Sequence, residues 1–77
     1  MSIEIIFFGQ LADKTGCSNL VLDNPGNIDT LTKLMKIQYP NLANAKFIIA
    51  VNNKIVLDNE PIEENSKLAF MPPFSGG

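Results

Sequence analysis

Only one segment of this sequence has a helical repeat long enough to cover a sheet, and that feature limits the fold more than any other. Asn27 is a typical helix-capping residue. The residues after it place apolar side chains on one helical face: Ile28, Leu31, Leu34, Met35 and Tyr39. Pro40 disfavours helical geometry at the residue before it, so we predict that the helix ends near Tyr39. The rest of the core must therefore come from strands.

Five segments have the composition and alternation of strands. They are residues 2–8, 17–22, 47–51, 55–57 and 67–71. Residues 10–15 are expected to form one helical turn that ends at Gly16. Asn24-Pro25-Gly26 predicts a type II turn, and Asn52-Asn53 predicts a tight hairpin turn, because these residues tolerate the backbone angles involved.

The order of elements is β-β-α-β-β-β, and it predicts a single helix packed on one face of one sheet. The C-terminal strand is expected beside the N-terminal strand, which places the two longest apolar runs near the centre. The predicted fold is therefore α+β, a β-grasp (ubiquitin-like) domain with a mixed sheet of about five strands. We assign residues 1–71 to this domain and residues 72–77 to an extended C-terminal tail.

Composition excludes several classes of function. The chain has 77 residues, 6 Lys and Arg against 8 Asp and Glu, a net charge of -2, no His and one Cys. All of its cations are Lys, which disfavours binding to nucleic acid. An internal disulfide, a cysteine-rich metal site and any His-dependent catalytic site are excluded. We expect no bound metal, no membrane association and a cytoplasmic location.

The first strand carries apolar residues on both faces. Ile3, Ile5 and Phe7 alternate on one face, while Ile6 and Phe8 lie on the other with Glu4. Two interpretations remain open. The strand is either central and covered on both sides, or it presents an apolar face to a partner.

The end of the sequence carries the most informative group, Pro72-Pro73-Phe74-Ser75-Gly76-Gly77. The prolines end the last strand and direct the tail away from the sheet. Phe74 offers an apolar anchor, and the two glycines could pass through a narrow channel. Extended, six residues reach roughly 20 Å. An ATP-dependent enzyme could adenylate the Gly77 carboxylate for attack by a sulfur donor, so the carrier itself would need no active site.

This terminus resembles the P-P-[VF]-[ST]-G-G ending of the MoaD family, the small sulfur-carrier subunit of molybdopterin synthase. Three internal segments are also similar to that family: Phe7-Phe8-Gly9, Ala50-Val51-Asn52 and Leu68-Ala69-Phe70. The resemblance extends over essentially the whole chain and includes its length.

The resemblance implies that Gly77 is adenylated by a MoeB-like activating enzyme that uses ATP, and then receives sulfur from a donor protein as a thiocarboxylate. It implies a MoaE-like large subunit that holds the catalytic side chains, within a heterotetramer, and cyclic pyranopterin monophosphate as sulfur acceptor. Gly77 would bear the sulfur and Gly76 would be its slender neighbour. Phe74 and Ser75 would contact the partner, following Pro72 and Pro73. We expect Ile6 and Phe8, with Phe74, at the large-subunit interface.

The chain departs from the family in two places. Many members have an Arg and an acidic residue after the first strand, where this chain has Ala12-Asp13. Asn65-Ser66 stands where a Gly-Asp turn is usual, and Asn can adopt the same left-handed backbone.

Alternative functions remain open at this stage. A ThiS-like carrier for thiazole synthesis uses the same terminal chemistry but usually lacks the Pro-Pro pair. Carriers that serve cysteine synthesis or tRNA thiolation, and archaeal or Urm1-like carriers that also conjugate to lysines, share this chemistry and differ in the acceptor. A ubiquitin-like interaction module that is never activated would use its apolar sheet face alone.

Overall fold

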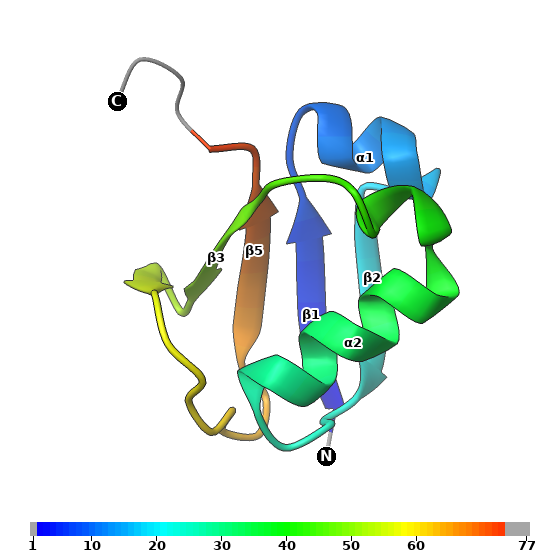
Figure 1. Cartoon of the computed structure of the whole chain (residues 1–77). Helices are drawn as coiled ribbons and strands as arrows, with labels where there is room; N and C mark the ends of the chain where they lie inside the picture. Colours follow the sequence, from blue (N-terminus) through cyan, green and yellow to red (C-terminus); the bar gives the residue numbers. More distant parts are fainter. Residues whose placement is uncertain (1, 74–77) are drawn as a thin grey trace.

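The structure is a computed structural model that describes residues 2–73 (Figure 1). Its elements follow the predicted order, with one short 3₁₀ turn that the sequence did not indicate. They are β1 (Ser2–Phe7), α1 (Gln10–Thr15), β2 (Asn19–Asp23), α2 (Ile28–Gln38), η1 (Pro40–Leu42), β3 (Ile48–Val51), β4 (Lys54–Val56) and β5 (Lys67–Met71).

The five strands form one mixed sheet in the order β2-β1-β5-β3-β4. β1 pairs with β2 in an antiparallel hairpin and with β5 in parallel, so the predicted neighbourhood of the first and last strands is confirmed. β3 joins the other side of β5 and forms the second predicted hairpin with β4. The helix α2 crosses one face of this sheet (Figure 1).

The core lies between α2 and the sheet. The inward residues of β1 alternate with partly exposed ones, as predicted, and Leu68 and Phe70 of β5 lie beside them. The most deeply buried large side chains are Phe70, Ile3, Ile5, Leu11, Leu31, Met35, Leu42 and Leu68. The Phe7 and Phe70 rings meet edge to face with centroids 5.4 Å apart, an arrangement that aromatic pairs favour.

The predicted helix is confirmed at both ends. The Asn27 side chain accepts a hydrogen bond from the Thr30 N–H (2.9 Å), and Tyr39 is the C-cap residue. One member of the predicted inward stripe is wrong, because Leu34 is 42% exposed. Ile28, Leu31 and Met35 bury the contact face at spacings of three and four residues, and Leu34 lies at its margin.

The η1 turn explains why the core extends past the end of the helix. Pro40 opens the turn, and Leu42 at its end is fully buried. The sequence analysis did not assign Leu42 to the core, because a single apolar residue after a proline has no periodicity to indicate its direction.

The predicted turns form with the expected backbone angles. Asn52 and Asn53 have φ values of 50° and 71°, as a tight hairpin turn between β3 and β4 requires. Asn65 has φ 63°, so the substituted turn before β5 keeps its left-handed residue. Gly26 has φ 106°, and the Asn24 side chain closes this bend by accepting from the Gly26 N–H (2.8 Å).

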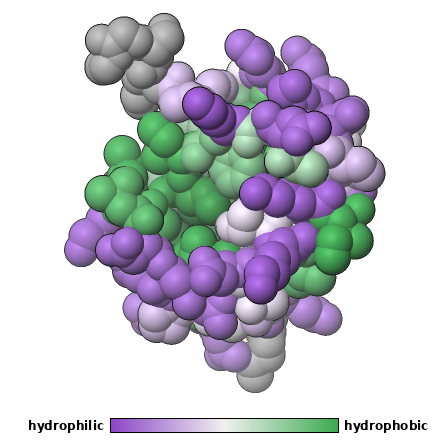
Figure 2. Space-filling model, in the orientation of Figure 1, coloured by the Kyte–Doolittle hydropathy of each residue, from purple (hydrophilic) through white to green (hydrophobic). Residues whose placement is uncertain are grey.

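The second face of the sheet, which we call the outer face, has no helix over it. It carries Ile6 of β1, Ala69 and Met71 of β5, and Ile48 and Ala50 of β3, which the strand registers place side by side. The interpretation that β1 is covered on both sides is therefore wrong, because no helix or strand among residues 2–73 packs on its outer face. Apolar side chains also reach the surface on the helix side next to β3, where Figure 2 shows a hydrophobic area.

Candidate functional site

The tail begins at the end of the sheet where β1 and β5 both finish. The two strands run in parallel, and the pairing continues past β1 because the Phe8 N–H donates to the Phe70 carbonyl oxygen (3.0 Å). Phe8 lies outside β1, so the predicted strand was one residue too long. Pro72 and Pro73 follow β5 directly, and they stop the ladder because neither has an N–H to donate.

Gly9 allows the chain to turn sharply beside this point. The Leu11 N–H donates to the Phe8 carbonyl oxygen (3.1 Å), which closes a tight turn. Gly9 has φ 57° and ψ −132°, a backbone conformation that residues other than glycine rarely adopt. A Cβ at Gly9 would lie 3.2 Å from the Cγ atom of Pro72. The turn after β1 is therefore packed directly against the first residue of the tail.

Phe8 and Ile6 lie on the outer face next to the root of the tail. Phe8 is 47% exposed and Ile6 is partly buried. Together with Ala50 and Ala69 they line a hollow of about 370 Å³, whose other lining includes Asn52, Asn53 and Asn65. An apolar centre with a polar rim is the usual anatomy of a protein interface. Ile6 and Phe8 thus lie together on one surface, and the third predicted interface residue, Phe74, lies outside the described residues.

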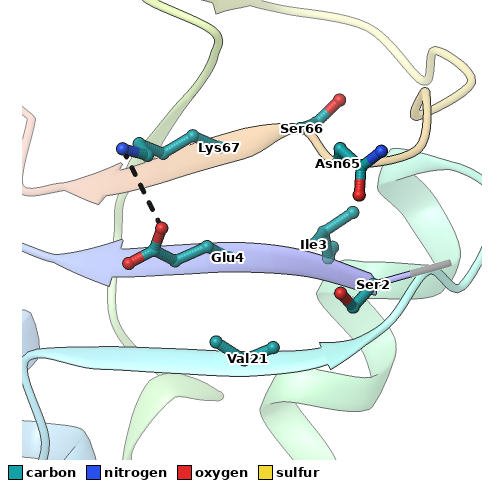
Figure 3. Close-up of a pocket in the computed structure, with 7 residues that line it drawn as sticks. All are labelled: Ser2, Ile3, Glu4, Val21, Asn65, Ser66 and Lys67. Carbon is teal, nitrogen blue, oxygen red and sulfur yellow. Dashed lines mark ion pairs between the residues drawn. The ribbon is translucent and has the colours of Figure 1, made fainter.

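A second hollow on the outer face lies at the opposite end of β1 (Figure 3). It has a volume of about 240 Å³ and is lined by Ser2, Ile3, Glu4, Val21, Asn65, Ser66 and Lys67. The Glu4 Oε1 and Lys67 Nζ atoms are 3.9 Å apart across β1 and β5, and both side chains are well exposed. Neither a nucleophile with a base nor a cluster of metal ligands lines this hollow.

Cys17 and Tyr39 bring two titratable side chains together at the margin of the helix-side core. The Cys17 Sγ and Tyr39 OH atoms are 3.8 Å apart, and the Tyr39 ring meets Phe7 edge to face. Burial raises the pKa of Tyr39 above 10.0, and the neighbouring Cys17 raises it further. Both side chains are partly buried and pack against the core.

The predicted tail lies only partly within the described residues. Pro72 and Pro73 are described and follow β5 directly, whereas Phe74, Ser75, Gly76 and Gly77 lie outside the described residues. Sequence reasoning did not identify Gly9 as a support for the tail. Its place directly after the first strand was visible, but its contact with Pro72 depends on the parallel pairing of β1 with β5.

Among residues 2–73, no group of three or more Cys, Asp or Glu side chains is arranged to hold a metal ion. The same residues include no helix that is long and apolar enough to cross a membrane.

A mixed sheet in the order β2-β1-β5-β3-β4, with one main helix on a single face, defines the β-grasp or ubiquitin-like class of small domain. The predicted fold class is confirmed. The model of the ThiS family matches residues 5–77, and the chain belongs to this family.

Relatives and solved structures agree with that assignment. The chain is 28% identical to the molybdopterin synthase sulfur carrier subunit of Escherichia coli (strain K12), covering 97% of this chain and 99% of the relative. One chain in a solved complex of subunits 1 and 2 of the molybdopterin-converting factor from Helicobacter pylori 26695 matches with a TM-score of 0.75 and 21% identity. The match covers 100% of this chain and 100% of that chain. SAMP1 from Haloferax volcanii matches with a TM-score of 0.80 and 20% identity, again over both full lengths.

Proposed function

We propose that this protein is a sulfur carrier and the small subunit of a molybdopterin synthase. The observation that carries the proposal is a family match that runs to Gly77, the residue on which the carrier chemistry depends. The relative from Escherichia coli, named as a molybdopterin synthase sulfur carrier subunit, covers nearly the whole chain and supports this particular role over that of other carriers.

The proposed chemistry takes place on the carboxyl group of Gly77. An activating enzyme transfers AMP from ATP to the carboxylate and releases pyrophosphate. A sulfide-level nucleophile from a donor protein then displaces AMP, which leaves a thiocarboxylate on Gly77. The large subunit positions this group against cyclic pyranopterin monophosphate, and the carboxylate is restored by water after the sulfur has been transferred.

The described part of the chain supports this division of labour. None of the four hollows described on residues 2–73 contains a nucleophile paired with a base, which fits a carrier whose reacting group lies on its tail. The sheet instead supports the root of a tail, because β1, β5 and Gly9 all contact the residues that lead into it.

We propose the outer face around Ile6 and Phe8 as the surface that meets the large subunit. Its support is the hollow that Ile6 and Phe8 line with both apolar and polar neighbours, and the exposed Phe8 ring near the end of β5. If the face is buried in the complex, the amides of residues 6–8 will exchange more slowly when the large subunit is added. Unchanged exchange there would contradict this assignment.

Mass spectrometry of the native protein tests the proposed function directly. Trypsin cleaves after Lys67, so one peptide carries both Met71 and Gly77. Replacing oxygen with sulfur adds almost the same mass as oxidising Met71, so the shift must be localised to the Gly77 fragment ion. A Met71→Leu variant removes the ambiguity, and iodoacetamide should alkylate a thiocarboxylate but not a methionine sulfoxide.

The expected result is sulfur on Gly77 and transfer of that sulfur to the pterin precursor when a large subunit is supplied. A protein that stays unmodified after incubation with ATP, the activating enzyme and a sulfur donor would contradict the carrier function. Sulfur on Gly77 without transfer to the pterin would retain the carrier function and reject molybdopterin synthesis.

A further inference from the structure

A hollow of about 340 Å³ lies at the root of the tail. It shares no lining residue with the hollow around Ile6 and Phe8. Its lining includes Gln10 and Lys14 of α1, Ala45 and Lys46 from the segment before β3, and Pro72 and Pro73. The hollow therefore touches the tail at its first two residues. Any protein that surrounds the tail must also approach this hollow.

Two lysines give this hollow a positive charge. Lys14 and Lys46 are both exposed, and no acidic residue lines the hollow. Among residues 2–73 the one ion pair within 4.0 Å joins Glu4 to Lys67, at the far end of the sheet. Both ammonium groups beside the tail are consequently left for an external partner, although the chain as a whole has a net charge of -2.

Apart from Asp13, which precedes Lys14 in α1 but does not line the hollow, the acidic residues lie toward the other end of the molecule. Asp23 lies opposite Ser2 in the sheet register, and the Asn65 N–H donates to the Ser2 carbonyl oxygen, which places both at the start of β1. The Ile28 N–H donates to the Glu60 carbonyl oxygen, which brings the loop carrying Glu60, Glu63 and Glu64 to the first turn of α2. An excess of carboxylates at that end, where Lys67 is paired with Glu4, contrasts with the two lysines that line the hollow at the tail.

We propose that the hollow between Lys14 and Lys46 receives carboxylate side chains of the activating enzyme at the mouth of the channel that accepts the tail. This inference rests on the proposed function. Because the tail can extend roughly 20 Å, the nucleotide phosphates lie far from the hollow, and the enzyme surface around the channel is what meets it. A carrier must bind this enzyme and leave again, and charge complementarity increases the association rate more than the lifetime of a complex.

A pair of double variants with equal net charge tests the proposal. Lys14→Glu with Lys46→Glu reverses the charge of the hollow. Lys33→Glu with Lys54→Glu makes the same change in net charge at exposed positions on α2 and β4. The association rate of each with the activating enzyme is measured by stopped flow at low and high salt, and thermal melting confirms that each variant folds.

We expect the double variant at Lys14 and Lys46 to associate about 10-fold or more slowly than the wild type at low salt. The double variant at Lys33 and Lys54 should be slowed much less. The difference should shrink at high salt, where charges at this distance are screened. Equal slowing by both pairs would reduce the effect to net charge and overturn the proposal. So would wild-type association by the first pair, or selective perturbation of the Lys14 and Lys46 amides by ATP without enzyme. If the wild-type protein is never adenylated, the proposed function itself fails, which is a separate result.

Discussion

At the scale of single residues, Gly9 connects the fold to the tail. We expect Gly9→Ala to destabilise the protein by about 2 to 3 kcal/mol, because the residue has positive φ and its new Cβ would lie 3.2 Å from Pro72. Gly16→Ala is the matched control. Gly16 also has positive φ, but a Cβ there meets nothing within 4 Å, so we expect a loss of about 1 kcal/mol.

Urea unfolding of the two variants gives both values, and their difference reports the contact with Pro72 together with the less favourable backbone angles of Gly9. Equal losses would show that this contact has no influence on stability. Adenylation of Gly9→Ala by the activating enzyme should also slow relative to Gly16→Ala, since a displaced Pro72 changes the direction in which the tail leaves the sheet.

Tyr39 is a second residue whose environment can be measured directly, because it is the one tyrosine in a chain without tryptophan. Burial and Cys17 raise its pKa, so tyrosinate absorbance should appear at a higher pH than in free tyrosine. Because the pKa of Tyr39 is higher in the folded protein than in the unfolded chain, the neutral phenol makes its full contribution to the free energy of unfolding below about pH 10. That contribution is lost as the pH rises through the pKa of the folded protein. Cys17→Ala should lower the midpoint of the tyrosinate titration partway toward 10.0. A midpoint below 10.0 in the folded protein would contradict the burial of the phenol.

At the scale of elements, local patterns predicted most of the fold. The cap at Asn27, the break at Pro40 and the paired asparagines at positions 52 and 53 each act through the neighbouring backbone, so they can be recognised from a few residues. β5 was predicted at its observed bounds, Lys67–Met71, because two prolines end it. The exposed side of Leu34 was missed, since the width of a helix's buried face depends on the sheet against which it packs.

Contacts between distant segments account for what the sequence did not show at the candidate site. Gly9 approaches Pro72 because β1 and β5 lie in parallel, and Lys14 shares a hollow with Lys46 because β3 also pairs with β5. Tertiary pairing of this kind has no local signal in a single sequence. The proposed chemistry of the tail, by contrast, could be predicted from the sequence because consecutive residues carry it.

The outer face is the element-scale feature that a partner should recognise. We expect Phe8→Ser to weaken binding of the large subunit about 10-fold or more, because the exposed ring is the largest apolar group beside the tail. Ile37→Ser is the control, since Ile37 is 76% exposed on α2, which covers the opposite face of the sheet. Isothermal titration with the large subunit measures both. Similar affinities for the two variants would move the interface away from the outer face.

At the scale of the whole molecule, the body and the tail should be separable. The buried core of the described residues runs from Ile3 to Phe70, and Gly76 and Gly77 have no side chains to add to it. We expect deletion of Gly76 and Gly77 to leave the free energy of unfolding unchanged within about 0.5 kcal/mol. The same deletion should abolish adenylation, because the shortened chain ends at Ser75 and its carboxylate would stop short of the nucleotide.

Binding of the truncated chain to the large subunit then distinguishes a carrier from a passive module. The apolar hollow around Ile6 and Phe8 stays intact after the deletion, so the shortened protein should still bind the large subunit and block synthesis by competing with the loaded carrier. Adding back full-length protein with sulfur on Gly77 should relieve the block in proportion to its excess. A truncated chain that still supports cofactor synthesis in cells would show that the sheet face alone performs the function, and that the terminal carboxylate carries nothing.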